Sequence, residues 1–272
     1  MKSKYLFLIF SLLFMYTEAK AVELCGRVGQ GEIVFGKAPK ESLVKFNKED
    51  ILKTDDGIFI IAFGRDEKKT QLLGIDENEY RLSVEPTKWN IQNIKGVPPQ
   101  KVTPSDSDLE AIELERKLLR ASLKEISKST AWRSGFIRPV EGRISGEFGG
   151  QRIMNNVPKN PHQGMDIAAK EGTEVRSSAD GEVVLAYPDL FYSGNVVVID
   201  HGFGLQTIYA HLKEMKVQRG DKVKQGDVIG LVGKTGRATG PHLHWGASLR
   251  GVRFNPQSLL DASEHQNHCR KL

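Results

Sequence analysis

Short apolar runs separated by polar or glycine-rich turns fill two long stretches of the chain, from residue 22 to about 84 and from 135 to about 258. The runs at 58–63 and 195–199 are typical, since each is rich in Ile, Val or Phe and follows a glycine. Runs of this length and composition, bounded by turn residues, indicate β-strands rather than helices. The pattern therefore predicts a mainly β protein with two β regions.

Each β region is expected to form a domain. We predict a small immunoglobulin-like β-sandwich over residues 22–97, because many short strands follow one another at turn-punctuated intervals. This region contains no histidine, so we expect it to bind, position or occlude rather than to catalyse. The second domain is predicted over residues 135–258, and a solvated polar tail over residues 259–272.

A proline-rich segment and a charged helix are predicted between the two domains, over residues 98–134. Prolines at positions 98, 99 and 104 indicate a stiff boundary. Ser105 or Asp106 is a candidate N-cap for a helix from about Asp108 to Ser129. The apolar residues of this segment approximate a helical stripe, which we interpret as a packing face against one of the domains.

The first 21 residues have the pattern of a secretory signal peptide. Lys2 and Lys4 precede the apolar run 5–15, and Ala19-Lys20-Ala21 offers a cleavage site after Ala21. An uncleaved membrane anchor is the alternative, but this run is well short of the roughly 20 residues that span a bilayer. We therefore expect export to the periplasm, with no stable membrane span after cleavage.

Composition and charge narrow the function classes. The chain has 272 residues, of which 39% are hydrophobic and 27% charged, as is usual for a soluble globular protein. Removal of residues 1–21 takes away three lysines and one glutamate, which leaves 36 basic and 33 acidic residues and a formal charge of +3. This weakly basic balance has no concentrated patch, so we expect no nucleic-acid partner.

The two cysteines lie far apart, at Cys25 and Cys269. In an oxidising compartment they could pair and join the two ends of the chain. The sequence leaves this pairing open, because it does not show whether the two Cα atoms come within bridging distance.

Five of the seven histidines lie between residues 162 and 244. Within a strand His242 and His244 would point to the same side, whereas His162 and Asp166 flank a glycine and suit a loop. Catalytic zinc usually takes three protein ligands from His, Asp, Glu and Cys. The pattern therefore predicts a zinc site with histidines left over for proton transfer. His265, His268 and Cys269 also have metal-like spacing, but we interpret them as part of the solvated tail.

From about residue 136 to residue 256 the chain resembles the lysostaphin-like (LytM-type) zinc metallopeptidases. Four motifs carry the resemblance: His162-x-x-x-Asp166, the segment from Gly194-Asn195 to His201-Gly202, Tyr209-Ala210-His211-Leu212, and Thr239-Gly240-Pro241-His242-Leu243-His244. The preceding sandwich and helix also look like the extra domain of exported Gram-negative members. The resemblance implies an antiparallel β peptidase domain with the duplicated hybrid motif.

Position by position, the resemblance implies one zinc ion held by His162, Asp166 and His244. His211 and His242 would be the catalytic pair, acting through attack of zinc-activated water, and either of them could be the base. The remaining histidine of this region, His201, matches a position that is not a ligand, so we expect it to be structural or a turn residue. Thr239 and Asp200 are candidates for the acceptor that orients a ligand imidazole.

The family cleaves peptide cross-links of peptidoglycan, which are pentaglycine bridges in some walls and D-alanyl–diaminopimelate bonds in others. We favour the second, because no wall-binding module is recognised and Asn155-Asn156-Val157 stands where glycine-bridge cutters tend to carry a tyrosine. We also expect the N-terminal domain or the loop 150–161 to restrict the groove, with a protein regulator as a further partner.

Two alternatives belong to other classes. The first is a non-catalytic LytM-type activator of other cell-wall hydrolases, or a wall-binding protein. The second is a sugar phosphotransferase component with the same duplicated hybrid motif. Export and Asp166 argue against the second alternative.

Overall fold

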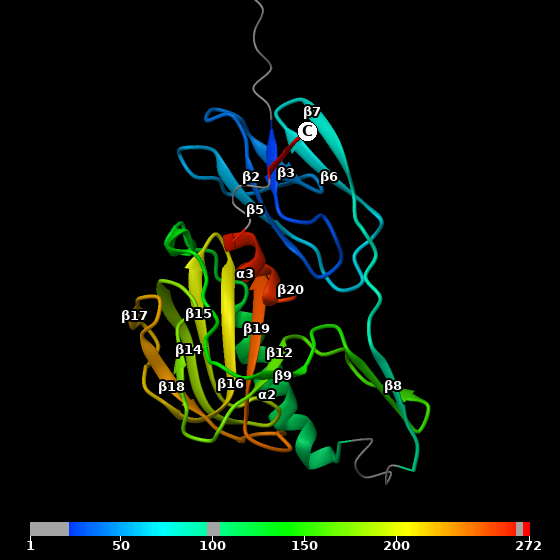
Figure 1. Ribbon diagram of the computed structural model, residues 1–272, viewed down its shortest axis with the longest axis vertical. Coiled ribbons are helices and arrows are strands. Elements are labelled where there is room, and N and C mark those ends of the chain that lie inside the picture. The colour runs from blue at the N-terminus through cyan, green and yellow to red at the C-terminus, as the bar shows by residue number, and fades with distance from the viewer. Residues whose placement is uncertain (1–21, 97–103, 265–268) are drawn as a thin grey trace, which may run out of the picture.

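The computed structural model describes residues 22–96, 104–264 and 269–272 (Figure 1). The N-terminal domain consists of two antiparallel four-stranded sheets. The first has the order β21 (Cys269–Lys271), β1 (Glu23–Cys25), β2 (Ile33–Lys37) and β5 (Ile58–Ala62). The second has the order β4 (Glu49–Asp50), β3 (Val44–Phe46), β6 (Thr70–Ile75) and β7 (Asn78–Ser83). The predicted β content is confirmed, whereas the immunoglobulin-like arrangement stays a prediction.

Strand β5 is buried on both faces, which explains its uninterrupted apolar sequence. Phe59 and Ile61 point into the core of the N-terminal domain. Ile60 and Ala62 point the other way and join the core of the C-terminal domain, together with Ile33. The two domains therefore share apolar packing at their junction instead of meeting through a polar contact alone.

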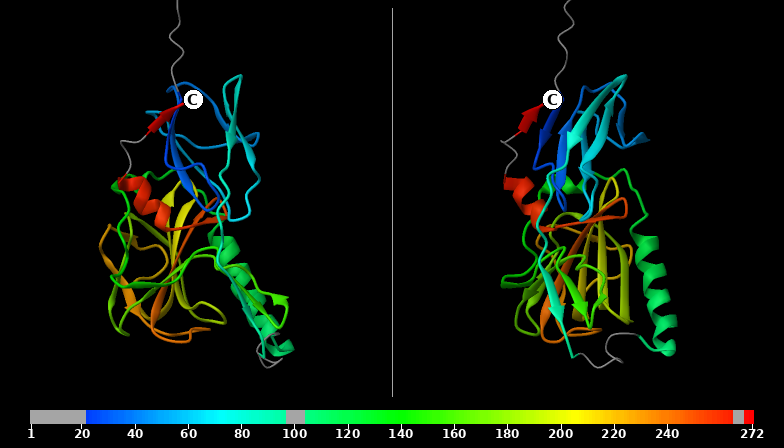
Figure 2. Two further views of the ribbon diagram at one scale, coloured as in Figure 1. Left: turned by 45° about the vertical axis from the view of Figure 1, so that its right-hand side comes forward. Right: turned by 90° about the vertical axis from the view of Figure 1, so that its right-hand side faces the viewer.

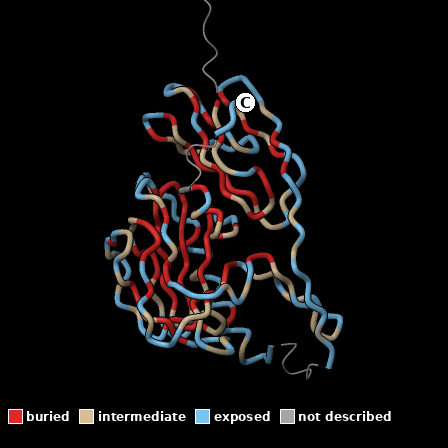
Figure 3. The backbone as a smooth tube through the Cα atoms, viewed as in Figure 1, coloured by how far each residue is buried: buried red, intermediate tan, exposed pale blue. Residues whose placement is uncertain are grey.

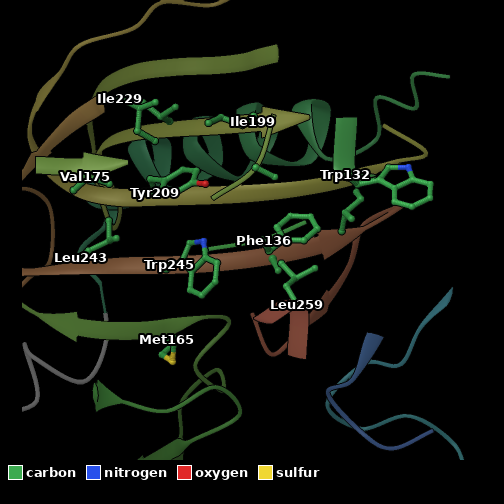
Figure 4. Close-up of a cluster of buried hydrophobic side chains, with 14 of the residues drawn as sticks. Trp132, Phe136, Met165, Val175, Ile199, Tyr209, Ile229, Leu243, Trp245 and Leu259 are labelled. Carbon is green, nitrogen blue, oxygen red and sulfur yellow. The ribbon is translucent and has the colours of Figure 1, made fainter. Parts of the chain in front are cut away.

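The C-terminal domain is built on one antiparallel ten-stranded sheet. Its strands are β9 (Arg143–Gly146), β12 (Met165–Ala168), β13 (Glu174–Arg176), β14 (Gly181–Leu190), β15 (Gly194–Gly202), β16 (Leu205–Met215), β17 (Lys222–Val223), β18 (Val228–Val232), β19 (His242–Leu249) and β20 (Val252–Phe254). The main path runs β17-β14-β15-β16-β19-β12-β9, while β18 joins β13 to β16 and β20 pairs with β19. Fully buried side chains such as Tyr209, Leu243 and Trp245 fill one face (Figure 4). Much of the backbone of this sheet belongs to buried residues (Figure 3).

A small three-stranded sheet joins the segment after the N-terminal domain to the C-terminal domain. Strand β8 (Ile91–Ile94) pairs in parallel with β10 (Gln151–Met154), which pairs in turn with β11 (Val157–Pro158). This sheet projects from the lower right of the molecule in Figure 1. The loop that leads to His162 is thus bound to the chain leaving the N-terminal domain.

Helix α2 (Asp106–Ser122) packs against β14 (Figure 2). Ser105 and Asp108 form a capping box at its N-terminus. The predicted C-terminal end near Ser129 is wrong, because the chain leaves the helix after Leu123. The carbonyls of Glu125 and Ser127 accept hydrogen bonds from Gln206 Nε2 and the Phe203 N–H, so they bond the turn between β15 and β16. A short 3₁₀ helix, η1 (Ala131–Ser134), then leads into the C-terminal domain.

The segment expected to be a solvated tail is mostly ordered. Helix α3 (Gln257–Glu264) buries Leu259 and Ala262 and packs against β2. Strand β21 pairs with β1 in the register Cys25↔Cys269, and these two cysteines form a disulfide with a Cα–Cα distance of 4.1 Å. The interpretation as a solvated tail is therefore wrong for α3, and the pairing that the sequence left open is present.

Several predictions from sequence fall on residues outside the described parts: the signal peptide, most of the proline-rich segment, His265 and His268. Within the described parts, no helix combines the length and apolar composition needed to cross a membrane.

Candidate metal centre

Three of the predicted residues meet at one point of the large sheet. Asp166 on β12 lies directly opposite His244 on β19, and His162 reaches the same point from the loop before β12. Asp166 Oδ1 lies 2.9 Å from His244 Nδ1 and 3.0 Å from His162 Nε2, and the two histidine nitrogens are 3.0 Å apart. Ligand atoms of a tetrahedral zinc site are separated by about 3.3 Å. The three side chains therefore fit a single zinc ion.

The strand alternation that was read from the sequence positions His244. Leu243 and Trp245 are fully buried in the core on one face of β19, while His242 and His244 leave the other face half-buried. Two glycines leave room for the ligands. A Cβ at Gly146 would lie 2.5 Å from Asp166 Oδ2, and one at Gly164 would lie 2.7 Å from His244 Cε1.

The ring of His162 is fixed by the backbone around it. Its Nδ1–H donates to the Glu147 carbonyl at 2.9 Å, which leaves Nε2 unprotonated and directed at Asp166 and His244. The Glu147 carbonyl therefore takes the role for which Thr239 and Asp200 were candidates. The Asp200 carboxylate instead accepts hydrogen bonds from Ser127 and the Gly202 N–H.

The electrostatics of the three ligand groups favour a cation. Burial raises the pKa of Asp166, but its hydrogen bonds with His162 and His244 outweigh burial and hold that pKa well below its usual range. Burial lowers the pKa of His244, and it also opposes the rise that Asp166 causes in the pKa of His162. The histidine pKa values move in opposite directions because His244 is the more deeply enclosed of the two. The pocket thus presents one carboxylate and two imidazoles.

His211 and His242 lie beside this pocket, with ring centroids 4.7 Å apart. His211 Nδ1 donates to the Thr235 carbonyl at 2.9 Å, and His242 Nδ1 donates to the Gly240 carbonyl at 2.8 Å. Both Nε2 atoms are therefore the unprotonated ones, and that of His242 lies 3.8 Å from Asp166 Oδ1. Burial, followed by repulsion from His244 and His242, lowers the pKa of His211 to about 4. His211 is thus neutral near pH 7 and able to accept a proton.

The backbone at His211 is unusual for a histidine, with φ at 62°. Its N–H donates to the Ser193 carbonyl at 2.8 Å, so the turn between β14 and β15 holds it. Helix α2 holds this turn in its own right. The buried Glu115 carboxylate accepts hydrogen bonds from the N–H groups of Tyr192 and Ser193 and from Ser193 Oγ.

Glu115 was not recognised in the sequence as a residue of the site. The signal was available, because Glu115 is a carboxylate on the apolar stripe that Ile112 and Leu119 define. A buried acidic residue on a packing face needs hydrogen-bond donors from the element it contacts. His201, by contrast, is structural as expected: it is fully buried and hydrogen bonds with the Asp180 carbonyl and Thr207 Oγ1.

An antiparallel sheet that presents a His-Asp-His ligand set beside two further histidines defines a metallopeptidase class of site. Residues 160–256 match peptidase family M23, so the chain contains a peptidase M23 domain.

Relatives of known name agree with this assignment. The chain is 47% identical over 123 residues to the peptidoglycan DD-endopeptidase ShyA of Vibrio cholerae. This match covers 43% of this chain and 28% of ShyA. The chain is 44% identical over 120 residues to the DD-carboxypeptidase/endopeptidase Mpg of Neisseria meningitidis, a match that covers 44% of this chain and 27% of Mpg. The matches thus span little more than a quarter of these relatives.

One solved structure extends the likeness to both domains. It is the crystal structure of a putative peptidase M23 from Pseudomonas aeruginosa, with a TM-score of 0.69 and 27% sequence identity. The match covers 88% of this chain and 97% of that chain. The match therefore reaches beyond the peptidase domain into the N-terminal part of the chain.

Proposed function

We propose that this protein is a zinc-dependent endopeptidase that hydrolyses the peptide cross-links of peptidoglycan, with the D-alanyl–diaminopimelate bond as its favoured target. The convergence of three ligand atoms within 3.0 Å of one another, beside two histidines whose Nδ1 atoms are already hydrogen-bonded, carries this proposal. The printed names of ShyA and Mpg support the substrate class.

In this proposal His162 Nε2, Asp166 Oδ1 and His244 Nδ1 hold the zinc ion. Zinc supplies Lewis-acid chemistry there, which polarises a carbonyl and lowers the pKa of water. Asp166 would reduce the charge of the site with zinc bound from +2 to +1.

Proton transfer falls to the two remaining histidines. One of the Nε2 atoms of His211 and His242 accepts the proton of the attacking water and returns it to the leaving amine. The other takes up a proton from solvent at Nε2 and, as an imidazolium, donates a hydrogen bond to the carbonyl oxygen as negative charge develops there. The Thr235 and Gly240 carbonyls accept from Nδ1 and leave Nε2 of both rings available for these two roles.

We also propose that the protein is exported to the periplasm and that its N-terminal domain positions the loop carrying His162. Arg65 Nε donates to the Gly149 carbonyl at 2.8 Å, and Trp89 packs edge-on against Phe148. The Gly149 N–H in turn donates to the His162 carbonyl at 2.8 Å. These contacts support a role in positioning and restricting one wall of the groove.

Digestion of purified sacculi tests the function. The metal content of the full protein is measured first, and the released muropeptides are then identified by mass spectrometry, with His211→Ala as the inactive control. We expect about one zinc per chain and loss of D-alanyl–diaminopimelate cross-links. Binding to sacculi by a zinc-free protein that releases nothing would instead identify a non-catalytic wall-binding protein.

A further inference from the structure

Arg253 on β20 lies beside the metal centre without a role in it. Its position in the β19–β20 hairpin is opposite Ser248. The side chain reaches back along β19, so that Nη1 lies 3.2 Å from where a Cβ of Gly246 would be. Gly246 is two positions from His244 and faces the same side of the strand, roughly 7 Å further along it. The guanidinium therefore lies on the face of the sheet that carries the metal ligands.

The glycine at this point permits the arrangement. Any side chain at Gly246 would meet both Arg253 Nη1 and Ile208 Cδ1, which is 3.3 Å from the same Cβ position. A larger residue would push the guanidinium off the sheet. The absence of a side chain at Gly246 therefore allows the Arg253 guanidinium to lie against the sheet at this position.

The charge of Arg253 has no partner among the residues that the structure describes. It makes no hydrogen bond and no ion pair with any of them. Arg250, three residues earlier, differs in this respect, because its Nη2 donates to the Ile60 carbonyl at 2.9 Å. Burial alone lowers the pKa of Arg253 to about 10. No Arg253 nitrogen is among the buried polar atoms that lack a partner, so the guanidinium reaches solvent on this face and is accessible to an anion.

The surrounding charges strengthen this argument. The guanidinium lies on the same face of β19 as His244, about two residues further along the strand. With zinc bound, the +1 charge of the ligand set and the Arg253 guanidinium would form two adjacent positive groups. Such a pair favours an anionic ligand over a neutral one.

The hairpin that carries Arg253 is held from the opposite side by the N-terminal domain. Arg250 bonds strand β5 through the Ile60 carbonyl, and the Gly64 turn packs near Val252 Cγ1, which is 3.6 Å from the Gly64 Cβ position. Arg253 therefore lies between the metal centre and the N-terminal domain, on a strand whose position both domains fix.

We propose that Arg253 is a specificity-determining residue that binds a free carboxylate of the substrate peptide, on the side of the metal centre that faces the N-terminal domain. This inference rests on the proposed endopeptidase function. A guanidinium binds a carboxylate through two parallel N–H···O bonds, which gives both affinity and orientation. The carboxylate is either the C-terminal carboxylate of a stem peptide or the free carboxylate of a diamino acid in the cross-link.

The test compares three forms of one cross-linked muropeptide dimer: the free acid, a form with the C-terminal carboxyl amidated, and a form with the diamino-acid carboxyl amidated. The kcat/KM of each form is measured for the wild-type protein, Arg253→Met and Arg253→Lys. Arg81→Met removes the same charge from an exposed position of the N-terminal domain and is the matched control. Zinc content and thermal unfolding confirm that each variant is folded and loaded.

We expect the wild-type protein to cleave one amidated form about 10- to 100-fold less well than the free acid, and that form identifies the carboxylate. Arg253→Met should lose a similar factor on the free acid and no longer distinguish the two. Arg253→Lys should retain part of the preference, and Arg81→Met all of it. Equal cleavage of all three forms by the wild-type protein, or a preference that survives in Arg253→Met, overturns the inference.

Failure of the proposed function gives a different result. In that case the wild-type protein cleaves none of the three forms, and the inference about Arg253 falls with it. Equilibrium binding to His211→Ala provides a second measurement that needs no turnover. The free acid should bind this variant about 10-fold or more tightly than the amidated form, and the added substitution Arg253→Met should abolish the difference.

Discussion

The proposed metal centre has a ligand half, made of His162, Asp166 and His244, and a proton-transfer half, made of His211 and His242. These two halves are built by different means. The ligand half is a matter of strand register, because Asp166 and His244 face each other in the β12–β19 pair. The proton-transfer half depends on irregular backbone. His211 has a positive φ, and carbonyl groups of the loop 233–241 orient both rings.

The difference shows where support comes from. The ligand half draws on the sheet and on the loop that Arg65 and Trp89 contact from the N-terminal domain. The proton-transfer half draws on helix α2, whose Glu115 fixes the turn that holds the His211 N–H. Substitutions in one half should therefore affect zinc binding, and substitutions in the other half should affect turnover with zinc in place.

Single histidine substitutions should give the largest difference between an effect on zinc binding and an effect on hydrolysis. His244→Ala removes a ligand, so it should lose both zinc and hydrolysis. His211→Ala should keep about one zinc per chain and lose a factor of about 10³ or more in kcat, since it removes a proton-transfer group. Metal analysis after dialysis and muropeptide release from sacculi measure the two effects. Full activity of either variant would sink the assignment of roles.

Two glycine substitutions test the same division without removing a functional group. A Cβ at Gly164 would lie 2.7 Å from His244 Cε1 and 2.6 Å from the Trp245 carbonyl oxygen. Gly164→Ala should therefore weaken zinc binding by about 10- to 100-fold, as loss of ligand support does. Competition with a chelator measures this affinity.

The counterpart is Gly194→Ala, in the turn beside His211. Gly194 has φ at 62°, and its Cβ would lie 2.5 Å from the Thr235 carbonyl carbon, so the loop that orients His211 must shift. We expect kcat to fall about 10-fold or more at unchanged zinc affinity, with a lower melting temperature. If Gly194→Ala instead weakened zinc binding as strongly as Gly164→Ala, the two halves would not be independent.

The sequence predicted the ligand half better than its surroundings. Strand alternation places His242 and His244 on one face from local sequence alone, and the motif resemblance brought His162 and Asp166 to the same point. Both inferences need only the immediate neighbours of each residue. The expectation that His201 lies outside the site rested on the same motif match.

Features that depend on long-range register were not predictable in this way. The Cys25–Cys269 disulfide requires β21 to pair with β1 across 244 positions. Arg253 reaches the metal face only through the register of the β19–β20 hairpin. Helix α2 ends at Ser122, short of the predicted Ser129, because the segment after it hydrogen bonds with Phe203 and Gln206. No local sequence pattern predicts these distant partners.

His201 provides a reference for the buried histidines of the site. Like His211, it hydrogen bonds through Nδ1 with a backbone carbonyl, and burial lowers its pKa to about 4. Its pKa rises to about 6.5 on unfolding. Between pH 4 and pH 6.5 the unfolded state therefore binds a proton at His201 that the folded state does not bind. The stability that neutral His201 contributes is complete above pH 6.5 and is lost as the pH falls towards 4.

This loss amounts to about 3 kcal/mol, from a difference of about 2.5 pKa units. Urea unfolding at pH 7 and at pH 4.5, with the disulfide intact, should show it in the wild-type protein and a smaller loss in His201→Gln. Hydrolysis at pH 7 should be unaffected by that variant. An identical acid dependence of both proteins would show that His201 does not limit acid stability.

The smallest expected effect lies on helix α2, outside the peptidase sheet. Glu115→Gln keeps the shape of the side chain but turns one acceptor oxygen into an N–H₂ group, which then opposes a donor of the 192–193 turn. We expect kcat to fall about 10-fold, with KM and zinc content unchanged, because the turn that bonds the His211 N–H loosens. Glu113→Gln is the matched control, since Glu113 is exposed on the same helix and, among the described residues, pairs with Arg116 alone. Equal kcat for both variants would show that the strands alone fix His211, whereas a loss of zinc in Glu115→Gln would show that helix α2 supports both halves of the centre.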